Sequence, residues 1–182
     1  MPTSLERPKP GEYNPYYDRY ISLIPGNDVI ATLTAQLPKT VALLSTRSED
    51  GDLRYAPGKW SVKETLGHMI DTERIMTYRA LRIARNDRTP IEGFEQDDFV
   101  RDGPHGDLSL ADLIEEFKTI RAATLAFLRN LRPADWSRRG IANNNEITVR
   151  ALAFVVAGHE LHHRQILEER YFQTSPARAE IA

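Results

Sequence analysis

Residues 148–171 read TVRALAFVVAGHELHHRQILEERY, and this stretch predicts one long amphipathic helix. Steps of three and four residues return to the same side of a helix, so its apolar positions form a single stripe. The residues on that stripe are Leu152, Val155, Val156, His159, His162, His163 and Ile166. Because His159 and His163 are one turn apart, about 6 Å along the axis, this helix can offer two imidazoles to one ion.

Two stretches in the first half of the chain show the same spacing. The first starts at a cap in the Asn-Asp pair at 27–28 and runs to residue 44, and Pro38 is expected to bend or break it. The second covers residues 61–86 and opens with an S-x-x-E capping box at Ser61. Both therefore read as helices with their own start signals.

A third helix is expected from Ser109 until Pro133 stops it, after a connection rich in Asp, Pro and Gly at residues 87–108. Such a connection is longer than bundles usually need, and loops of this kind often cover a site. His105 lies in it beside Gly and Pro and is expected to be exposed to solvent.

Four amphipathic helices without a convincing strand predict an all-α fold, a four-helix bundle. The expected organisation is an N-terminal arm at 1–26, one bundle domain at 27–172 and a C-terminal tail at 173–182. We expect the metal site described below at the open end of the bundle core.

Composition excludes several classes of protein. With no cysteine among 182 residues, disulfides, thiolate metal sites and a cysteine nucleophile are ruled out. A polar, proline-rich start and the lack of a long apolar run predict a cytoplasmic protein without membrane contact. The net charge of −2 gives no attraction to nucleic acid. The arginines at 79, 82, 85 and 88 are read as a solvent-facing end of the second helix.

A third candidate ligand is His68, on the inward stripe of the second helix. Three buried imidazoles would each need a separate partner, whereas one divalent ion uses all their lone pairs. Glu64 and Asp71 are one turn to either side of His68 and could orient an imidazole by accepting its N–H. His162 shares the face of the other histidines, and its role stays open.

Residues 159–163 also match H-E-x-x-H, the zincin signature, in which Glu160 would be a general base. Zincins add a further downstream ligand and a strand that aligns a peptide, and neither pattern occurs here. A metalloprotease is therefore the minor alternative.

Two motifs together resemble the DinB/YfiT-like superfamily of metal-dependent enzymes: W-S-x-x-E-x-x-x-H-x-x-D-x-E at residues 60–73 and H-x-x-H-H at 159–163. The resemblance implies an up-down-down-up bundle, often a homodimer, with zinc or nickel on His68, His159 and His163. It also implies thiol-dependent transferases and isomerases among the relatives, beside proteins labelled hydrolases.

Three functions follow from these observations. The first is a thiol-dependent S-transferase or isomerase acting on a small electrophile, with an ion that activates a low-molecular-weight thiol. The second is a hydrolase with a metal-bound water, in which Glu160, Glu64 or Asp71 assists proton transfer. The third is a helical ligand-binding module in which the metal is only a structural clip.

Overall fold

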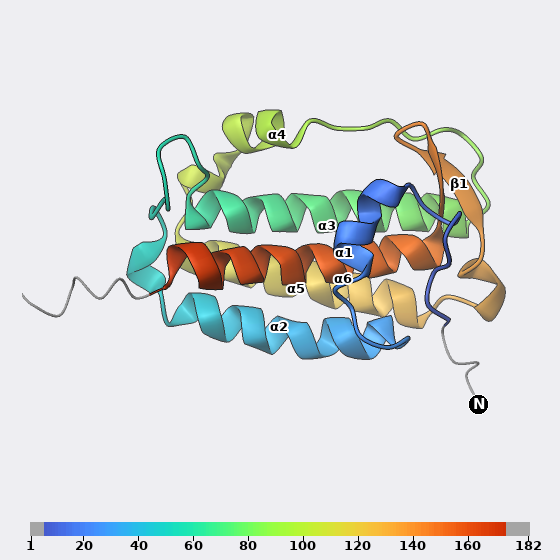
Figure 1. The fold of residues 1–182 in the computed structure, drawn as a ribbon, viewed down its shortest axis with the longest axis horizontal. Helices are drawn as coiled ribbons and strands as arrows, with labels where there is room; N and C mark the ends of the chain where they lie inside the picture. The colour runs from blue at the N-terminus through green and yellow to red at the C-terminus, as the bar shows by residue number, and fades with distance from the viewer. Residues whose placement is uncertain (1–5, 174–182) are drawn as a thin grey trace, which may run out of the picture.

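The computed structural model describes residues 6–173, and four long helices lying side by side form its body (Figure 1). They are α2 (Val29–Ser45), α3 (Val62–Ala84), α5 (Leu110–Arg129) and α6 (Val149–Ile166). Helices α2 and α6 run one way along the bundle and α3 and α5 the other way, which is the up-down-down-up order (Figure 1). The predicted four-helix bundle is confirmed.

Shorter elements connect and cover the bundle. In chain order they are η1 (Pro15–Tyr17), α1 (Asp18–Ile21), η2 (Ser48–Asp50), α4 (Gln96–Asp102), η3 (Pro104–Gly106), η4 (Pro133–Asp135), β1 (Arg139–Ala142), β2 (Asn145–Thr148) and η5 (Leu167–Tyr171). Helix α1 packs on α6, and α4 packs on α3 (Figure 1). The long connection after α3 thus contains a helix of its own.

Side-chain caps start the four long helices where the sequence predicts. Asp28, Ser61, Ser109 and Thr148 each accept a hydrogen bond from a backbone N–H in the first turn. At Ser61 the carboxylate of Glu64 also accepts from the cap's own N–H at 2.6 Å, which completes the predicted capping box. These bonds satisfy N–H groups that a helix start leaves without partners.

Pro38 was expected to bend or break the first helix, and it does not break it, because α2 is continuous from Val29 to Ser45. Pro38 is exposed, so the carbonyl that loses its intrahelical donor can bond to water. Leu33, Thr40 and Leu44 are buried on either side of it. Both halves of the helix therefore pack into the core.

A hairpin corrects the expectation that the chain has no strand. Strands β1 and β2 pair antiparallel, with Ala142 opposite Asn145 beside the turn. Asn143 and Asn144 connect them with φ values of 49° and 60°, the left-handed backbone of a tight two-residue turn. Asparagine tolerates this conformation better than most residues do. The hairpin lies at the end of the bundle where α3 finishes (Figure 1).

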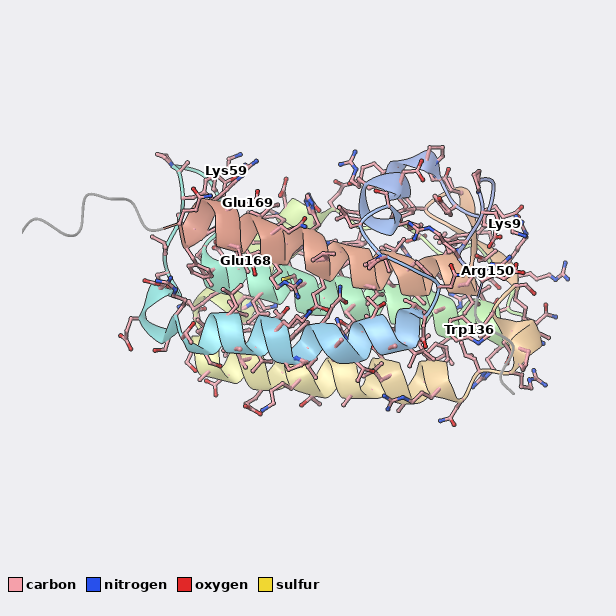
Figure 2. All side chains as sticks on the ribbon, turned by 60° about the horizontal axis from the view of Figure 1, so that its bottom comes forward. Lys9, Lys59, Trp136, Arg150, Glu168 and Glu169 are labelled. Atoms are coloured by element: carbon pink, nitrogen blue, oxygen red, sulfur yellow. The ribbon has the colours of Figure 1, made fainter. Side chains whose placement is uncertain are left out.

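The N-terminal arm is part of the packed structure rather than a separate segment. Tyr20, Ile21 and Ile24 are buried in the same core cluster as α6. Arg150, labelled at the hairpin end of the bundle in Figure 2, donates to both carboxylate oxygens of Glu12 at 2.5 and 2.6 Å. The predicted boundary at residues 26 and 27 therefore separates two sequence regions that share one core. The predicted tail lies outside the described residues except for its first residue.

Candidate metal centre

Three histidines converge from two helices. The Nε2 atom of His159 on α6 lies 3.0 Å from Nε2 of His68 on α3 and 3.1 Å from Nε2 of His163, one turn further along α6. One ligand atom from each residue lies within 4.8 Å of the others. The three residues that helical spacing selects are thus brought together, and we refer to them as the three-histidine cluster.

This geometry fits a metal ion. A tetrahedral ion with metal–nitrogen bonds of about 2.0–2.1 Å separates its ligand nitrogens by about 3.4 Å. The nitrogen spacings in the cluster are a few tenths of an ångström shorter, so small rotations of the rings would admit an ion. Three protein ligands leave at least one coordination position for a substrate or water.

Burial keeps the three imidazoles neutral, as metal ligands must be. The residues are 3%, 5% and 9% exposed in the order His68, His159 and His163. Burial, with His105 as a smaller cause, lowers the pKa of His68 to about 4. Burial also lowers the pKa of His159 and of His163 well below the usual value, with the neighbouring imidazoles as a smaller cause.

The cluster lies between α3 and α6 rather than at the open end of the core, where it was expected. His68 is the seventh residue of the 23-residue α3, and His159 is the eleventh of the 18-residue α6. The Trp60 ring lies 4.7 Å from the His68 ring, and the Tyr20 ring meets His159 edge to face at 5.3 Å. Aromatic neighbours therefore fix the orientation of two of the rings.

Glu160 turns away from the cluster into the bundle. Its carboxylate accepts a hydrogen bond from Thr40 at 2.6 Å and lies 2.6 Å from a guanidinium nitrogen of Arg121. Arg121 is fully buried and also donates to both carboxylate oxygens of Glu73 at 2.9 and 2.7 Å. This buried ion-pair network crosses from α6 to α5 and α3. The proposed role of Glu160 as a general base is untested, and its carboxylate already has two partners.

The other two predicted carboxylates also have partners outside the cluster. Glu64 accepts from Arg54 at 2.6 and 3.0 Å in addition to its capping bond. The Asp71 carboxylate lies 3.5 Å from Nε2 of His105 and 3.4 Å from Arg74. Neither carboxylate belongs to the group of mutually close ligand atoms among residues 6–173. Their assignment to proton transfer stays a prediction.

The two remaining histidines differ from each other. His105 was expected to be exposed, but it is buried against Gly67, where a Cβ atom would come within 2.1 Å of the His105 ring. The absence of a side chain at Gly67 makes room for the ring. His162 is partly exposed and packs against Tyr20 and His163, with ring centroids 5.4 and 5.1 Å away. It adds no atom to the cluster.

Two cavities reach different histidines of the cluster. The first, here named the arm cavity, has a volume of about 550 Å³, and the second, the Trp60 cavity, about 540 Å³. The arm cavity is lined by Asn14, Tyr16, Tyr17, Tyr20, His68, Thr72, Met76, Arg79, Phe94, Glu95, Gln96, Asp97, Ala142, Asn143, Asn145, Val155 and His159. The Trp60 cavity is lined by Tyr55, Gly58, Lys59, Trp60, Thr65, Asp97, Arg101, His163, Ile166 and Tyr171. Asp97 of α4 lines both.

Two residues of the arm cavity were not predicted to line a site. The Thr72 hydroxyl is buried without a hydrogen-bond partner, which leaves it free for a bound molecule. Arg79 was expected to face solvent, but its side chain is buried, with an overall exposure of 2% for the residue. Both follow His68 on the same stripe of α3, at steps of four, four and three residues through Met76. This helical spacing from His68 is the feature of the sequence that could have identified both residues.

Comparisons with known proteins identify a family and a similar solved structure. The family model described as the DinB superfamily matches residues 32–167. Among solved structures, the chain is similar to YfiT from Bacillus subtilis, described as a probable metal-dependent hydrolase with an unusual four-helix bundle topology. That match has a TM-score of 0.61 and 17% sequence identity, and it covers 92% of this chain and 94% of YfiT. No curated protein matches the chain in sequence. Among the described residues, no helix is both long and apolar enough to cross a membrane.

Proposed function

We propose that this chain, which belongs to the DinB superfamily, is a metal-dependent enzyme that joins a thiol to a small electrophile. The observation that carries the proposal is the convergence of three neutral imidazole nitrogens with 3.0 and 3.1 Å spacings. Imidazole ligands suit zinc and nickel, the two ions we expect here.

The two cavities favour a reaction with two organic reactants. His68 and His159 line the arm cavity, whereas His163 lines the Trp60 cavity, so an ion held by the three histidines would be reached from both cavities. A reaction with water would need only one cavity of this size. Two separate spaces of more than 500 Å³ suit a thiol in one and its electrophilic partner in the other.

The chemistry of the cavity lining indicates what a bound ion and the protein side chains would each contribute to the reaction. A divalent ion on the cluster lowers the pKa of a thiol that binds to it, which supplies the nucleophile at neutral pH. The protein holds the ligand rings in place through Trp60 and Tyr20, and it offers the free hydroxyl of Thr72 to a reactant. Glu64, Asp71 and Glu160 already have other partners, so the ion rather than a carboxylate is expected to activate the nucleophile.

A hydrolase is the second candidate. YfiT is described as a probable metal-dependent hydrolase, and the open coordination position of a three-histidine site suits water as well as a thiol. A structural clip is the third possibility, and it requires no turnover at all.

One set of assays distinguishes the transferase, the hydrolase and the structural clip. Protein purified without chelator is analysed for metal content and then reloaded with zinc or nickel. The loaded protein is tested with cysteine or coenzyme A against monochlorobimane, and separately with p-nitrophenyl acetate in the absence of thiol. Faster conjugation than with metal-free protein supports the transferase, and thiol-independent ester cleavage supports the hydrolase. A large loss of melting temperature on chelation without either activity supports the clip.

Two histidine variants on one helix provide the matched control. His163→Ala removes a cluster ligand and should abolish both stoichiometric metal binding and metal-dependent rate. His162→Ala changes the neighbouring histidine, which adds no atom to the cluster, and should retain the metal. Retention of metal and rate by His163→Ala would overturn the assignment of the site.

A further inference from the structure

Arg79 is a buried cation with an incomplete set of partners. Its Nη2 donates to the carbonyl oxygen of Glu92 at 2.7 Å, and its Nη1 lies 3.7 Å from the weakly accepting sulfur of Met76. Its Nε is buried and has no hydrogen-bond partner. A buried guanidinium with an unpaired N–H costs folding free energy unless another group binds there.

No carboxylate balances this charge among residues 6–173, because none of their Asp or Glu oxygens forms an ion pair with Arg79. The hydroxyl of Tyr17 lies within hydrogen-bonding reach of the guanidinium, and burial raises the pKa of this hydroxyl, so it stays neutral at pH 7 and does not balance the charge. Burial itself lowers the pKa of Arg79, with Tyr17 as a smaller, opposing influence. Arg121, the other fully buried arginine described here, has two carboxylate partners.

The unpaired charge lines the same cavity as His68 and His159 of the three-histidine cluster. His68 and Arg79 are eleven residues apart on α3, roughly 16 Å along the helix axis. The Arg79 side chain leans toward the helix N-terminus and hence toward His68, which shortens the gap to the order of 10 Å. Asn143 and Asn145 of the hairpin line the cavity as well and add amide donors to its wall.

The cavity has acidic residues too, but they differ from Arg79 in their surroundings. Glu95 and Asp97 line it from the start of α4 and are exposed to solvent. Charges in water are screened, whereas a buried charge keeps most of its field. The buried part of the cavity therefore favours a negative group despite the acidic side chains in α4.

We propose that the arm cavity binds a small molecule with a carboxylate at one end, which Arg79 holds while the reacting end reaches the three-histidine cluster. The second half of this statement rests on the proposed function. A carboxylate suits the site better than a phosphate, because one negative charge balances one guanidinium and a buried dianion would leave an excess. The free Nε–H and a second guanidinium N–H also match the two oxygens of a carboxylate.

The test uses ligands that can bind the metal at one end and Arg79 at the other. Monohydroxamates of succinic, adipic, suberic and sebacic acid present a metal-binding group at one end and a carboxylate at the other. Each is compared with its methyl ester by calorimetry on the zinc-loaded protein. For the best chain length, the acid should bind at least about tenfold more tightly than the ester, because a hydrogen bond to a charged group is worth that much. In Arg79→Gln the ratio should fall to about one, while the affinity for the ester stays unchanged.

The control variant is Arg82→Gln, one turn further along α3. Arg82 pairs with Asp87 and does not line the cavity, so its loss should leave the acid-to-ester ratio at the wild-type value. Equal binding of acid and ester to the wild type would overturn the proposal. Arg79→Gln weakening both ligands alike would overturn it too, since that result marks a purely structural arginine.

A second readout needs no metal and keeps the two proposals distinguishable. Octanoate and octanamide are titrated into metal-free protein carrying ¹⁵N-labelled arginine, and the Nε–H signal absent from Arg79→Gln is followed by NMR. Octanoate should shift this signal and octanamide should not. If the hydroxamates bind no better than the matching primary amides, the metal assignment fails, and the NMR result alone decides the role of Arg79. No shift with octanoate would overturn it.

Discussion

Gly158→Ala tests how the arm closes over the cluster. Gly158 lies on α6 directly before His159, and the backbone of Tyr20 crosses it at close range. A Cβ atom at this position would be 2.1 Å from the Tyr20 carbonyl oxygen and 2.4 Å from its carbonyl carbon. Both atoms are backbone, so no side-chain rotation can relieve the clash. The arm must instead move away from α6.

The expected loss of stability can be worked out from these distances. Ordinary contact begins at about 3.4 Å, so an atom at 2.1 Å requires the arm to withdraw by about 1.3 Å. Overfilling a packed core costs about 1–3 kcal/mol, and replacing a mid-helix glycine by alanine returns about 0.5–1 kcal/mol. The free energy of unfolding should therefore fall by up to about 2.5 kcal/mol. Tyr20 should also lose its edge-to-face contact with His159.

Urea unfolding followed by circular dichroism measures the stability, and hydrogen exchange of a peptide covering residues 12–24 reports on the arm. Faster exchange of this peptide with little change in α2 is expected. Gly106→Ala is the matched control, because nothing lies within 4 Å of its Cβ position. It should change the free energy by no more than about 1 kcal/mol. Unchanged stability and arm exchange in Gly158→Ala would refute the reasoning.

Three further predictions concern stability. Arg121→Met leaves the carboxylates of Glu73 and Glu160 buried without a cation, so urea curves at pH 7 should show a loss of about 3–5 kcal/mol. Ser61→Ala removes the side-chain cap of α3, and the same curves should show a loss of about 0.5–2 kcal/mol. The third is a pH dependence: the cluster imidazoles have lowered pKa values in the folded state, so the unfolded chain binds more protons below pH 6.5. Metal-free protein should lose stability as the pH falls from about 6.5 toward 4, by up to about 1.4 kcal/mol per pH unit for each imidazole. A free energy of unfolding that stays constant over this pH range would contradict the burial of three neutral imidazoles in the cluster.

The sequence predicted the helices because their signals are local. A cap and a 3.6-residue period involve neighbours within one or two turns, and the capping box at Ser61 and Glu64 was found as expected. The spacing of His159 and His163 is local in the same sense. Only the prediction that His68 approaches His159 required the assumption of a helix bundle. The structure shows that approach. The homodimer, the small-molecule substrate and the cytoplasmic location stay predictions.

The features that the sequence did not predict depend on distant contacts. Arg79 carries a charge that normally indicates exposure, and it is buried because the loop after α3 brings Glu92 and Phe94 over it. His105 is buried because Gly67, on another element, has no side chain. No period along α3 or along the loop contains that information. The hairpin is different, since two adjacent asparagines at 143–144 are themselves a local turn signal.

The predicted acids show where helical spacing stops being informative. Spacing places Glu160 beside His159, but a carboxylate on a helix can turn to either flank. Arg121 and Thr40 supply donors at 2.6 Å on the side away from the cluster, and hydrogen bonds to a charged group are about twice as strong as neutral ones. The arginine therefore outcompetes a neutral imidazole N–H for the carboxylate. It follows that a Glu160 variant will report first on bundle stability, and its rate is informative only at temperatures where the variant is fully folded.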